Sequence, residues 1–353
     1  MTAARFIIGD TREVVASLPD ASVDLVLTSP PFLALRSYLP ADHPDKGSEI
    51  GSEGTPAAFL AVLLDLAQGW RRVLAPHGSI CVELGDTYAS CGGTTDKRES
   101  SNGGNDFAPR GPRGHGAGWP LDKSLCMIPQ LFAASLSYGR NLLEPTQTFD
   151  PWRVRNVVRW VRPNPPVGAL GDKFRPATSE MTVACMSRTR WFDIDAVRED
   201  RGGAPPLDWW KIPTHPYPGS HYATWPPALC VKPIKAMCPE RVCRVCGEPS
   251  RRIVEHERTF SNVTASSGRS RVAKQGGPLG ADYSVNRVTL GWTDCGHDAW
   301  RPGVVLDPFG GSGTTGMVAT GLGRDAILID IDARNLDLAR ARIGMFLTAE
   351  GNQ

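Results

Sequence analysis

A glycine-rich turn near the C-terminal end of the chain constrains the fold more than any other feature. The apolar segment 304–307 predicts a short buried strand, which runs directly into Pro308-Phe309-Gly310-Gly311-Ser312-Gly313-Thr314. Glycines at this point let the backbone approach a ligand where a Cβ would clash. A second strand, predicted at 326–331, carries Asp330 at its tip, where a carboxylate can accept hydrogen bonds from two ribose hydroxyls. The pair of features favours a nucleoside cofactor over an ordinary tight turn.

Strands and helices alternate at both ends of the chain. Apolar spacing and capping residues predict strands at 5–8, 23–27, 79–84, 304–307 and 326–331, and helices at 11–18, 55–74, 314–320 and 333–347. This alternation predicts a doubly wound α/β sheet, covered by helices on both faces and assembled from the two chain ends. In such a sheet ligands bind outside the carboxyl ends of the strands, where the strand order reverses.

Composition limits the class of protein. The 353 residues suggest about two domains, and 41% hydrophobic with 22% charged residues is typical of a soluble globular protein. The net charge of +2 excludes a uniformly basic nucleic-acid coat, so any nucleic-acid contact must use local patches. No segment has the length of a membrane helix, the N-terminus lacks a signal-peptide layout, and the nine cysteines do not suggest disulfides. We therefore expect a reducing, cytoplasmic location.

A second motif, Thr28-Ser29-Pro30-Pro31-Phe32, follows the predicted strand at 23–27. Two prolines fix φ and remove two amide donors, so the backbone carbonyls there are rigid. A fixed carbonyl beside a serine hydroxyl can accept hydrogen bonds from an exocyclic amino group, and the phenylalanine offers a face on which a base can stack. Taken alone, the pentapeptide is also compatible with an ordinary turn at the end of a strand.

Together the two motifs resemble the S-adenosylmethionine-dependent DNA amino-methyltransferases of the permuted (beta-type) class, in which the catalytic motif precedes the cofactor motif. Short strings that match the family in order include 9–10, 50–53, 71–74, 84–88, 159–165, 175–180, 191–195 and 221–227. The resemblance implies a Rossmann-like methyltransferase fold with circularly permuted motif order and a seven-stranded sheet. It also implies S-adenosylmethionine as the cofactor and double-stranded DNA as the partner.

The resemblance assigns the cofactor-binding residues. Asp10 would hold the adenine amine, Asp330 the ribose and the glycine-rich turn the rest of the cofactor. The full implied set is Asp10, Thr28, Thr224, Asp307, Pro308, Phe309, Gly310, Gly311, Gly313, Thr314 and Asp330.

The first residue of the tetrapeptide Ser29-Pro30-Pro31-Phe32 indicates the substrate. In the family that the chain resembles, serine at this position usually accompanies methylation of cytosine N4, so the resemblance implies cytosine as the target base. The base would be flipped out of the duplex, because its amino nitrogen is otherwise paired. Phe32 would stack on the cytosine, while Ser29 Oγ and the Pro30 carbonyl accept from N4–H. Three alternatives stay open: an adenine-N6 enzyme, a methyltransferase acting on RNA or protein, and a non-enzymatic zinc-containing DNA-binding protein. A separately encoded restriction nuclease, a bacterial or phage origin and the oligomeric state are not decided by the sequence.

A third motif, Cys243-Arg244-Val245-Cys246-Gly247, has the shape of a zinc knuckle and is followed by Cys295-Gly296-His297. Cys243, Cys246, Cys295 and His297 would supply the four ligands of a structural zinc site, which would leave no open catalytic position. The 48 residues between Cys246 and Cys295 exceed the common spacing, so free thiols or a redox pair remain an alternative. Four arginines, Arg153, Arg155, Arg159 and Arg162, fall within ten residues that hold no acid, with Trp152 directly before them and Trp160 among them. They predict either a phosphate-contacting edge or a solvated face.

These observations predict five parts of the chain. Residues 1–88 form the catalytic half of the methyltransferase domain and 301–353 the cofactor-binding half. Between them we expect a flexible loop at 89–122, a central region at 123–237 and a zinc-knuckle insert at 238–300 with a flexible stretch at 261–280. The central region would include target recognition and the return of the chain to the core, and it would read the DNA sequence together with the zinc knuckle.

Overall fold

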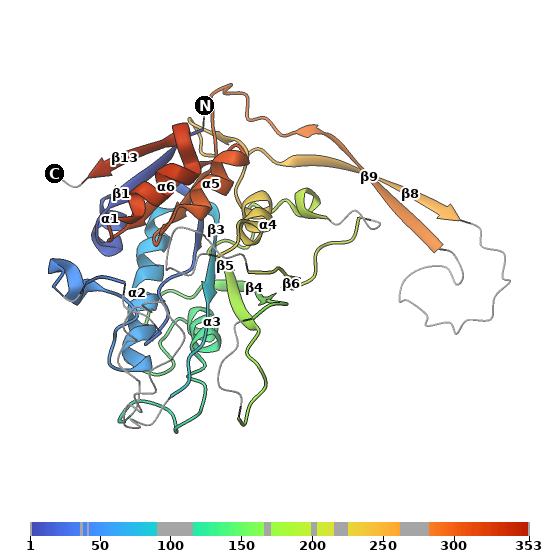
Figure 1. Cartoon of the computed structure of the whole chain (residues 1–353). Coiled ribbons are helices and arrows are strands. Elements are labelled where there is room, and N and C mark those ends of the chain that lie inside the picture. The colour runs from blue at the N-terminus through green and yellow to red at the C-terminus, as the bar shows by residue number, and fades with distance from the viewer. Residues whose placement is uncertain are drawn as a thin grey trace, which may run out of the picture.

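A nine-stranded mixed sheet forms the centre of the computed structural model (Figure 1). The structure describes residues 2–35, 38–40, 42–89, 116–165, 171–198, 203–214, 225–261 and 282–351. Thr224 and most of the stretches predicted to be flexible, 90–115 and 262–280, lie outside these residues. The strand order is β13-β1-β12-β11-β2-β3-β5-β4-β6.

Six neighbouring strands of this sheet run parallel: β13 (Leu347–Gly351), β1 (Ala4–Ile8), β12 (Asp325–Asp330), β11 (Val304–Asp307), β2 (Val23–Thr28) and β3 (Leu74–Leu84). Strand β5 (Thr178–Cys185) pairs antiparallel with β3 and with β4 (Arg153–Val161), and β6 (Trp209–Lys211) closes the edge parallel to β4. Burial on both faces explains the nearly continuous apolar sequence of β2, every residue of which is buried.

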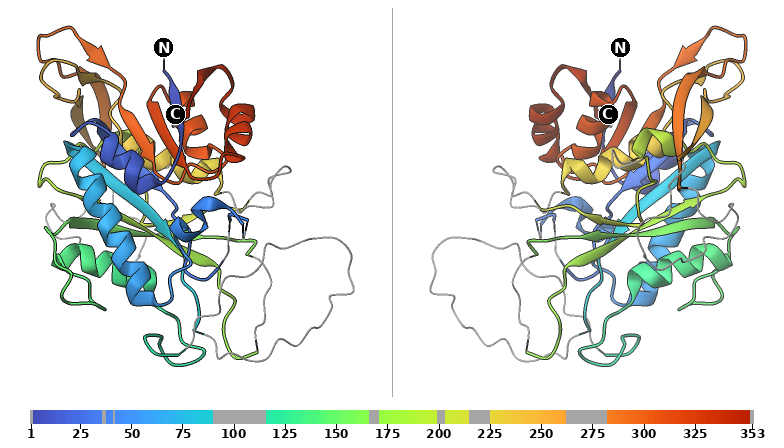
Figure 2. Two further views of the ribbon diagram at one scale, coloured as in Figure 1. Left: turned by 90° about the vertical axis from the view of Figure 1, so that its left-hand side faces the viewer. Right: turned by 90° about the vertical axis from the view of Figure 1, so that its right-hand side faces the viewer.

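Helices cover both faces of the sheet (Figure 2). One hydrophobic core contains side chains of α1 (Thr11–Ser17), α2 (Pro56–Val73) and α3 (Ile128–Tyr138). The other contains side chains of α4 (Pro227–Met237), α5 (Thr314–Gly321) and α6 (Asn335–Ile343). The predicted doubly wound α/β architecture is confirmed. Within the part of the chain that the structure describes, three short 3₁₀ helices complete the fold: η1 (Pro44–Ser48), η2 (Ile194–Val197) and η3 (Gly344–Phe346).

Helix α2 shows how local sequence fixes one of these elements. Its N-cap Thr55 accepts a hydrogen bond from the Ala58 backbone N–H at 3.2 Å, and Pro56 occupies the first helical turn, where its missing N–H costs nothing. Apolar residues at helical spacing, among them Phe59 and Trp70, face the sheet and are buried.

Two sequence expectations for the sheet edge were wrong. The helix predicted over 333–347 ends at Ile343, because the next residue, Gly344, adopts a φ of +64° that stops the helix. The chain then forms β13, which pairs with β1 and extends the sheet beyond the seven strands that the family resemblance implied. Alternation in 347–351 is too short and too polar to have predicted a strand.

Between α4 and β11 the chain leaves the sheet. A two-stranded ladder joins β7 (Val242–Cys243) to β10 (Trp300–Arg301), and a separate hairpin joins β8 (Arg252–Ser261) to β9 (Asp282–Trp292). The hairpin projects from the body of the molecule as an arm (Figures 1 and 2). Among the described residues, no helix is both long and apolar enough to cross a membrane.

Candidate functional site

The two predicted motifs meet at the point where the strand order reverses. Strands β11 and β2 are neighbours, with Val305 opposite Leu25 and Leu306 opposite Val26. From β2 the chain continues on one side to β3, and from β11 it continues on the other side to β12. Residues near positions 30 and 310 therefore lie side by side at the carboxyl edge of the sheet, as the doubly wound topology predicted.

A buried carboxylate joins the ends of these two strands. Asp307 Oδ1 accepts a hydrogen bond from Thr28 Oγ1 at 2.7 Å, and Asp307 Oδ2 accepts from Thr315 Oγ1 at 2.6 Å. Burial raises the pKa of Asp307 to about 6, against the opposing effect of the bonds from Thr315 and Thr28. Thr28 is itself fully buried, so its hydroxyl serves this internal link between the catalytic and cofactor motifs.

The glycines of the turn are needed for two different reasons. A Cβ on Gly310 would lie 2.9 Å from Leu328 Cβ, and one on Gly313 would lie 2.9 Å from Ala339 Cβ. These two glycines therefore let the turn pack closely against β12 and α6. The sequence analysis had explained them by the close approach of a ligand. Gly311, with φ of +48°, has open space around the missing Cβ and is the glycine that leaves room on the pocket side.

Asp330 is fixed beside the turn. Its Oδ2 accepts from the Gly311 backbone N–H at 2.7 Å, and its Oδ1 accepts from the Asp332 backbone N–H at 2.8 Å. Burial raises the pKa of Asp330 to about 6, although these backbone donors favour the charged form. The carboxylate is thereby oriented at the tip of β12 without a cationic partner in these bonds.

A pocket opens over this edge of the sheet. Ten of the catalytic and cofactor-binding residues predicted from the sequence line this pocket: Asp10, Ser29, Pro31, Asp307, Pro308, Phe309, Gly310, Gly311, Thr314 and Asp330. Thr28, Pro30, Phe32 and Gly313 are not among its lining residues, although each is adjacent to one in the chain. Further lining residues that the sequence did not single out individually include Tyr38, Leu39, Glu49, Ile50, Trp225 and Asn335.

Asp10 lines the pocket but is already engaged. It is the N-cap of α1, accepting from the Arg12 backbone N–H at 2.8 Å, and it also pairs with the Arg12 guanidinium. Partial burial opposes its charge, yet the bonds from Arg12 outweigh this effect and lower the pKa of Asp10. The guanidinium also donates to the Ser48 carbonyl at 3.0 Å, which ties the Gly9-Asp10 segment to the loop before Ile50.

The catalytic candidate Ser29 has a partner that the sequence analysis missed. Its hydroxyl donates to Glu83 Oε2 at 2.6 Å, and Glu83 is 2% exposed at the end of β3. Burial raises the pKa of Glu83, against the effect of hydrogen bonds from Ser179 and Ser29. The available signal was an acidic residue inside the otherwise apolar strand segment Ile80–Leu84, where a structural reason for a charge is absent.

Phe32 is held by two glycines from neighbouring segments. A Cβ on Gly85 would lie 2.6 Å from Phe32 Cε2, and a Cβ on Gly51 would lie 3.0 Å from the Phe32 carbonyl oxygen. Gly51 also has a φ of +94°, a conformation that side-chain-bearing residues rarely adopt. The sequence strings around these glycines, matched to the family above, therefore shape the loop that carries the tetrapeptide.

Three of the four arginines in and directly after β4 make contacts within the protein. Arg159 pairs with Glu180 at 3.0 Å, Arg162 stacks on Trp160 and donates to the Thr178 carbonyl at 2.9 Å, and Arg153 donates to the Met186 carbonyl. These contacts favour the structural interpretation of the cluster over a row of free phosphate ligands.

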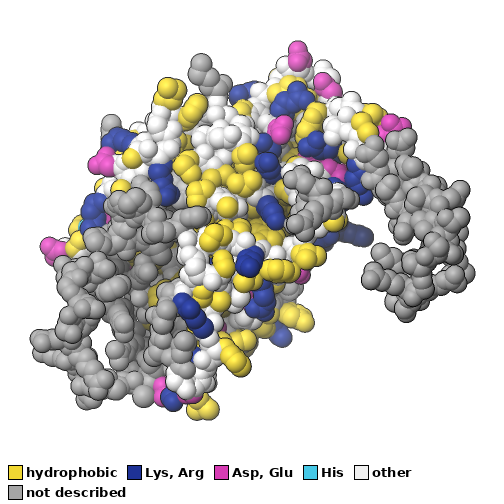
Figure 3. All heavy atoms as spheres, turned by 45° about the vertical axis from the view of Figure 1, so that its right-hand side comes forward, with side chains coloured by type: hydrophobic (Ala, Val, Ile, Leu, Met, Phe, Trp, Pro, Cys, Tyr) yellow, Lys and Arg dark blue, Asp and Glu magenta, His cyan; other side chains and the backbone are white. Residues whose placement is uncertain are grey.

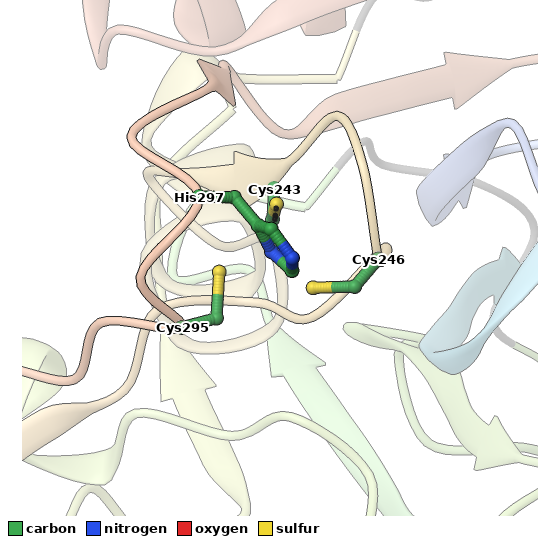
Figure 4. A group of neighbouring side chains, drawn as sticks. All are labelled: Cys243, Cys246, Cys295 and His297. Atoms are coloured by element: carbon green, nitrogen blue, oxygen red, sulfur yellow. Dashed lines mark hydrogen bonds between the residues drawn. The ribbon is translucent and has the colours of Figure 1, made fainter.

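The third motif forms a compact cluster away from the pocket. Side chains of Cys243, Cys246, Cys295 and His297 point toward one another from the end of β7 and two loops, and their ligand atoms all lie within 4.8 Å of one another (Figure 4). Each loop has a glycine in the left-handed region directly after a cysteine, Gly247 at +72° and Gly296 at +79°. The long spacing between the two cysteine motifs is taken up by the β8–β9 arm.

This cluster is attached to the amino edge of the sheet. In the β7–β10 ladder Cys243 lies opposite Trp300, and the adjacent Arg301 donates to both carboxylate oxygens of Asp24, at 2.6 and 3.2 Å. Asp24 is fully buried in β2 and also lies 2.9 Å from His77 Nε2. Burial disfavours its charge, but His77 and Arg301 together lower the pKa of Asp24.

Known proteins share both this sequence pattern and this fold. Across 97% of the chain, 27% of residues are identical to the type II methyltransferase M.SmaI of Serratia marcescens, of which 91% is covered. Identity is 26% over 95% of the chain with M.XycI of Xanthomonas campestris pv. cyanopsidis, of which 86% is covered.

Two solved structures share the fold. PvuII DNA methyltransferase (cytosine-N4-specific) superposes with a TM-score of 0.57 at 16% identity, covering 97% of this chain and 86% of that one. TTHA0409 of Thermus thermophilus, complexed with S-adenosyl-L-methionine, gives 0.51 at 17% identity, covering 99% of each chain. The model of the N6/N4 methyltransferase family, described as DNA methylase, matches residues 23–241 and 301–341, which is most of the chain. The chain therefore belongs to the N6/N4 DNA methylase family and is a DNA methyltransferase.

Proposed function

We propose that this DNA methyltransferase transfers a methyl group from S-adenosylmethionine to the exocyclic N4 of a cytosine. The observation that carries the proposal is Ser29, the first residue of the tetrapeptide, held at the pocket by its bond to Glu83. The fold shared with a cytosine-N4-specific methyltransferase supports the choice of base. The family also contains adenine-N6 enzymes, which form the second candidate.

The residues of the pocket fit S-adenosylmethionine. Asp330 offers a carboxylate to two ribose hydroxyls, and apolar Ile50 and Ile331 offer walls to an adenine ring. The space beside Gly311, where a side chain is missing, would let the charged amino-acid end of S-adenosylmethionine approach the turn. The methionine end would lie toward Ser29 and Trp225, on the β2 side of the pocket. The complex of TTHA0409 with this cofactor supports the assignment. When bound, the cofactor supplies an electrophilic methyl group on sulfur.

Ser29 and Glu83 would prepare the amino nitrogen. Because the Ser29 hydroxyl gives its hydrogen to Glu83 Oε2, its lone pairs remain free to accept from an N4–H. Together with the Pro30 carbonyl this fixes the direction of the nitrogen lone pair, and most of the acceleration comes from such positioning. Glu83 would also offset positive charge that develops on the nitrogen. Glu83→Gln tests this positioning role, since it should lower turnover and alter its pH profile without changing cofactor affinity.

The target base must leave the duplex to reach this pocket, because the amino group is otherwise paired. The loop glycines Gly51 and Gly85 fix Phe32, and the ring would stack on the extruded cytosine. A separately encoded restriction nuclease is compatible with this activity, as the type II relatives are modification enzymes by name.

We also propose that Cys243, Cys246, Cys295 and His297 bind a structural zinc ion. With zinc–sulfur bonds of about 2.3 Å and a zinc–nitrogen bond of about 2.0 Å, tetrahedral geometry separates sulfur and nitrogen by about 3.5 Å. Cys243 Sγ and His297 Nδ1 lie 3.5 Å apart. Four protein ligands leave no position for a substrate, and the ion would serve folding. The family match supports an insert here, since it leaves residues 242–300 between its two segments.

The test is nucleoside mass spectrometry on DNA from a methylation-free host that expresses the protein. N4-methylcytosine is the expected product. N6-methyladenine instead would retain the cofactor site and the family but overturn the role given to Ser29 in base choice. If neither modified base is found although the protein is soluble and binds the cofactor, DNA methylation in that host is overturned. The search for a substrate would then turn to RNA and protein.

A further inference from the structure

Glu83 lies between two serines, and only one of them lines the pocket. The Ser29 hydroxyl donates to Glu83 Oε2 at 2.6 Å, and the Ser179 hydroxyl also bonds to the Glu83 carboxylate. Ser179 comes from β5, the strand next to β3, where Glu83 lies opposite Met181. Glu83 and Ser179 are 2% and 3% exposed. The second serine therefore reaches the carboxylate from within the sheet and not from the pocket.

Arg162 reaches this second serine from the end of β4. Its Nη1 lies 3.5 Å from Ser179 Oγ, and its Nη2 donates to the Thr178 carbonyl at 2.9 Å. The guanidinium also stacks on Trp160, with Cζ 5.1 Å from the ring centroid, and the Arg162 backbone N–H donates to the Ala177 carbonyl at 2.8 Å. These contacts fix the guanidinium beside the amino end of β5.

Arg162 and Glu83 act on each other without a direct ion pair. Among the described residues Arg162 has no carboxylate in ion-pair contact, whereas Arg159, three residues earlier, pairs with Glu180 at 3.0 Å. Burial lowers the pKa of Arg162, and the charge of Glu83 opposes this effect. Burial raises the pKa of Glu83, and the two serines and Arg162 act in the opposite direction. Each charge therefore compensates part of the burial of the other, across one intervening hydroxyl.

The other titratable groups packed on this face of β3 do not supply a cation to Glu83. The thiols of Cys81 on β3 and Cys230 on α4 belong to the same hydrophobic core, and burial raises the pKa of each, to about 12 for Cys81. Three charged side chains of the neighbouring elements lie elsewhere: Asp24 near the start of β2, Arg190 beyond the far end of β5, and Lys232 of α4, stacked on Trp210 of β6. Within the described part of the chain, Arg162 is the cation that acts on Glu83.

We propose that Arg162 is a positioning residue for methyl transfer, which acts through the Ser179 hydroxyl to keep Glu83 charged and aimed at Ser29. A direct arginine–carboxylate pair would engage both oxygens of Glu83 in two parallel bonds, whereas a serine between them leaves an oxygen for Ser29. The inference rests on the role proposed for Ser29 and Glu83. Its rival is a phosphate contact, since Lys and Arg side chains run down the middle of one face of the molecule (Figure 3).

The test measures methyl transfer between pH 5.5 and 9 with full-length protein, labelled S-adenosylmethionine and genomic DNA from a methylation-free host. Glu83 must be ionised to accept the hydrogen of Ser29, so turnover falls on acidification as Glu83 becomes protonated. Without the cation the pKa of Glu83 rises further, and the acidic limb of the turnover profile moves to higher pH. We expect Arg162→Gln to move this limb upward by about one pH unit, which is about tenfold in turnover on the acidic side, with recovery toward pH 9.

Further variants separate positioning from folding. Ser179→Ala should move the limb in the same direction, because it removes the hydroxyl through which Arg162 acts. Arg162→Lys should return the limb toward its wild-type position, because it restores the charge. Arg159→Gln is the matched control, since Arg159 lies on the strand that Arg162 follows but pairs with Glu180. It should leave the limb in place, and cofactor affinity should stay at the wild-type value in every variant.

An unmoved limb in both Arg162→Gln and Ser179→Ala would overturn the inference, as would a loss of turnover that is equal at every pH. A raised KM for DNA with unchanged kcat would overturn it in favour of the phosphate contact. Glu83→Gln separates this inference from the proposed function. If that variant loses the acidic limb while Arg162→Gln keeps the wild-type profile, only the role of Arg162 falls. If Glu83→Gln leaves turnover unchanged, the role proposed for Glu83 falls as well.

Discussion

Two buried aspartates on neighbouring parallel strands show how differently the two edges of this sheet are built. Asp24, toward the amino edge, lies between the Arg301 guanidinium and His77, and its pKa is lowered. Asp307, at the carboxyl edge, is bound by two threonine hydroxyls and a backbone N–H, and its pKa is raised to about 6. Both side chains are almost fully buried, so the difference lies in their partners.

The contrast teaches which edge serves stability and which serves chemistry. At the amino edge the charge of Asp24 is neutralised within the protein, and its ion pair with Arg301 ties the insert that carries the Cys–His cluster to β2. At the carboxyl edge Asp307, Asp330 and Glu83 are satisfied by neutral donors, so their negative charge is not cancelled by a paired cation in these bonds. Such a site favours ligands that bring hydrogen-bond donors or positive charge.

The largest effect is expected from Asp24→Asn. The change leaves the half-buried Arg301 guanidinium and the buried His77 beside a neutral group, and removing the buried charge of such a pair costs about 3 kcal/mol of unfolding free energy. Urea unfolding measures the loss. Asp20→Asn removes an exposed ion pair with Arg72 and should change little. Equal stability of the two variants would contradict the role of the amino edge.

Ser29→Ala should act on the other edge and on a different quantity. Losing the acceptor for the amino group should reduce turnover by about 100-fold, since positioned groups of this kind contribute that order of rate. Cofactor affinity, measured by calorimetry, should stay within about twofold, because the residue does not hold the cofactor. An equal loss of turnover and cofactor affinity would show that Ser29 belongs to the cofactor site.

Substitutions of Asp330 and Asp325 compare the two ends of β12. Removing the charged acceptor at the tip of β12 should weaken S-adenosylmethionine binding by about tenfold, the order expected for a hydrogen bond to a charged group. The matched control is Asp325→Asn at the start of the same strand, whose carboxylate accepts from the Ala3 backbone N–H at 2.9 Å. Similar binding losses in both variants would mean that the effect comes from the strand and not from the pocket.

The smallest effect is a pH dependence at the carboxyl edge. Asp330 must be ionised to accept from two hydroxyls, and with its pKa raised to about 6 it becomes protonated as the pH falls through that value. Between pH 7.5 and 5.5 cofactor affinity should fall by about fourfold, the change in the ionised fraction for one such group. The dependence should largely disappear in Asp330→Asn. Affinity that rises on acidification would contradict the assignment.

The sequence predicted the architecture because its signals are local. Thr55-Pro56 marks a helix start, and the apolar runs Leu25–Leu27 of β2 and Val304–Leu306 of β11 indicate strands buried on both faces. The glycine-rich turn and the proline pair could be predicted for the same reason, because glycine and proline act on the backbone conformation of their own residues. The placement of both motifs at one sheet edge then follows from the general rule for doubly wound sheets.

Partners distant in sequence escaped prediction. The bond from Ser29 to Glu83 joins residues 54 apart, and the one from Thr28 to Asp307 joins residues 279 apart. Strand β13 was missed because its short, polar segment becomes a strand only when β1 offers an open edge. Gly310 and Gly313 were correctly placed in the turn, but their packing against Leu328 and Ala339 could not be inferred from spacing.

What the sequence by itself determined is the set of groups available for chemistry: a serine before two prolines, an acid at a strand tip, and three cysteines and a histidine at the spacing of a metal site. These groups depend on the covalent structure and local backbone preference of the residues themselves, which are the same in any fold. What only the tertiary structure decided is the charge environment of these groups. Burial and the choice between arginine and threonine as a partner set the pKa values of Asp24 and Asp307 in opposite directions. Those partners come from distant segments, so they exist only once the sheet has brought its strands together.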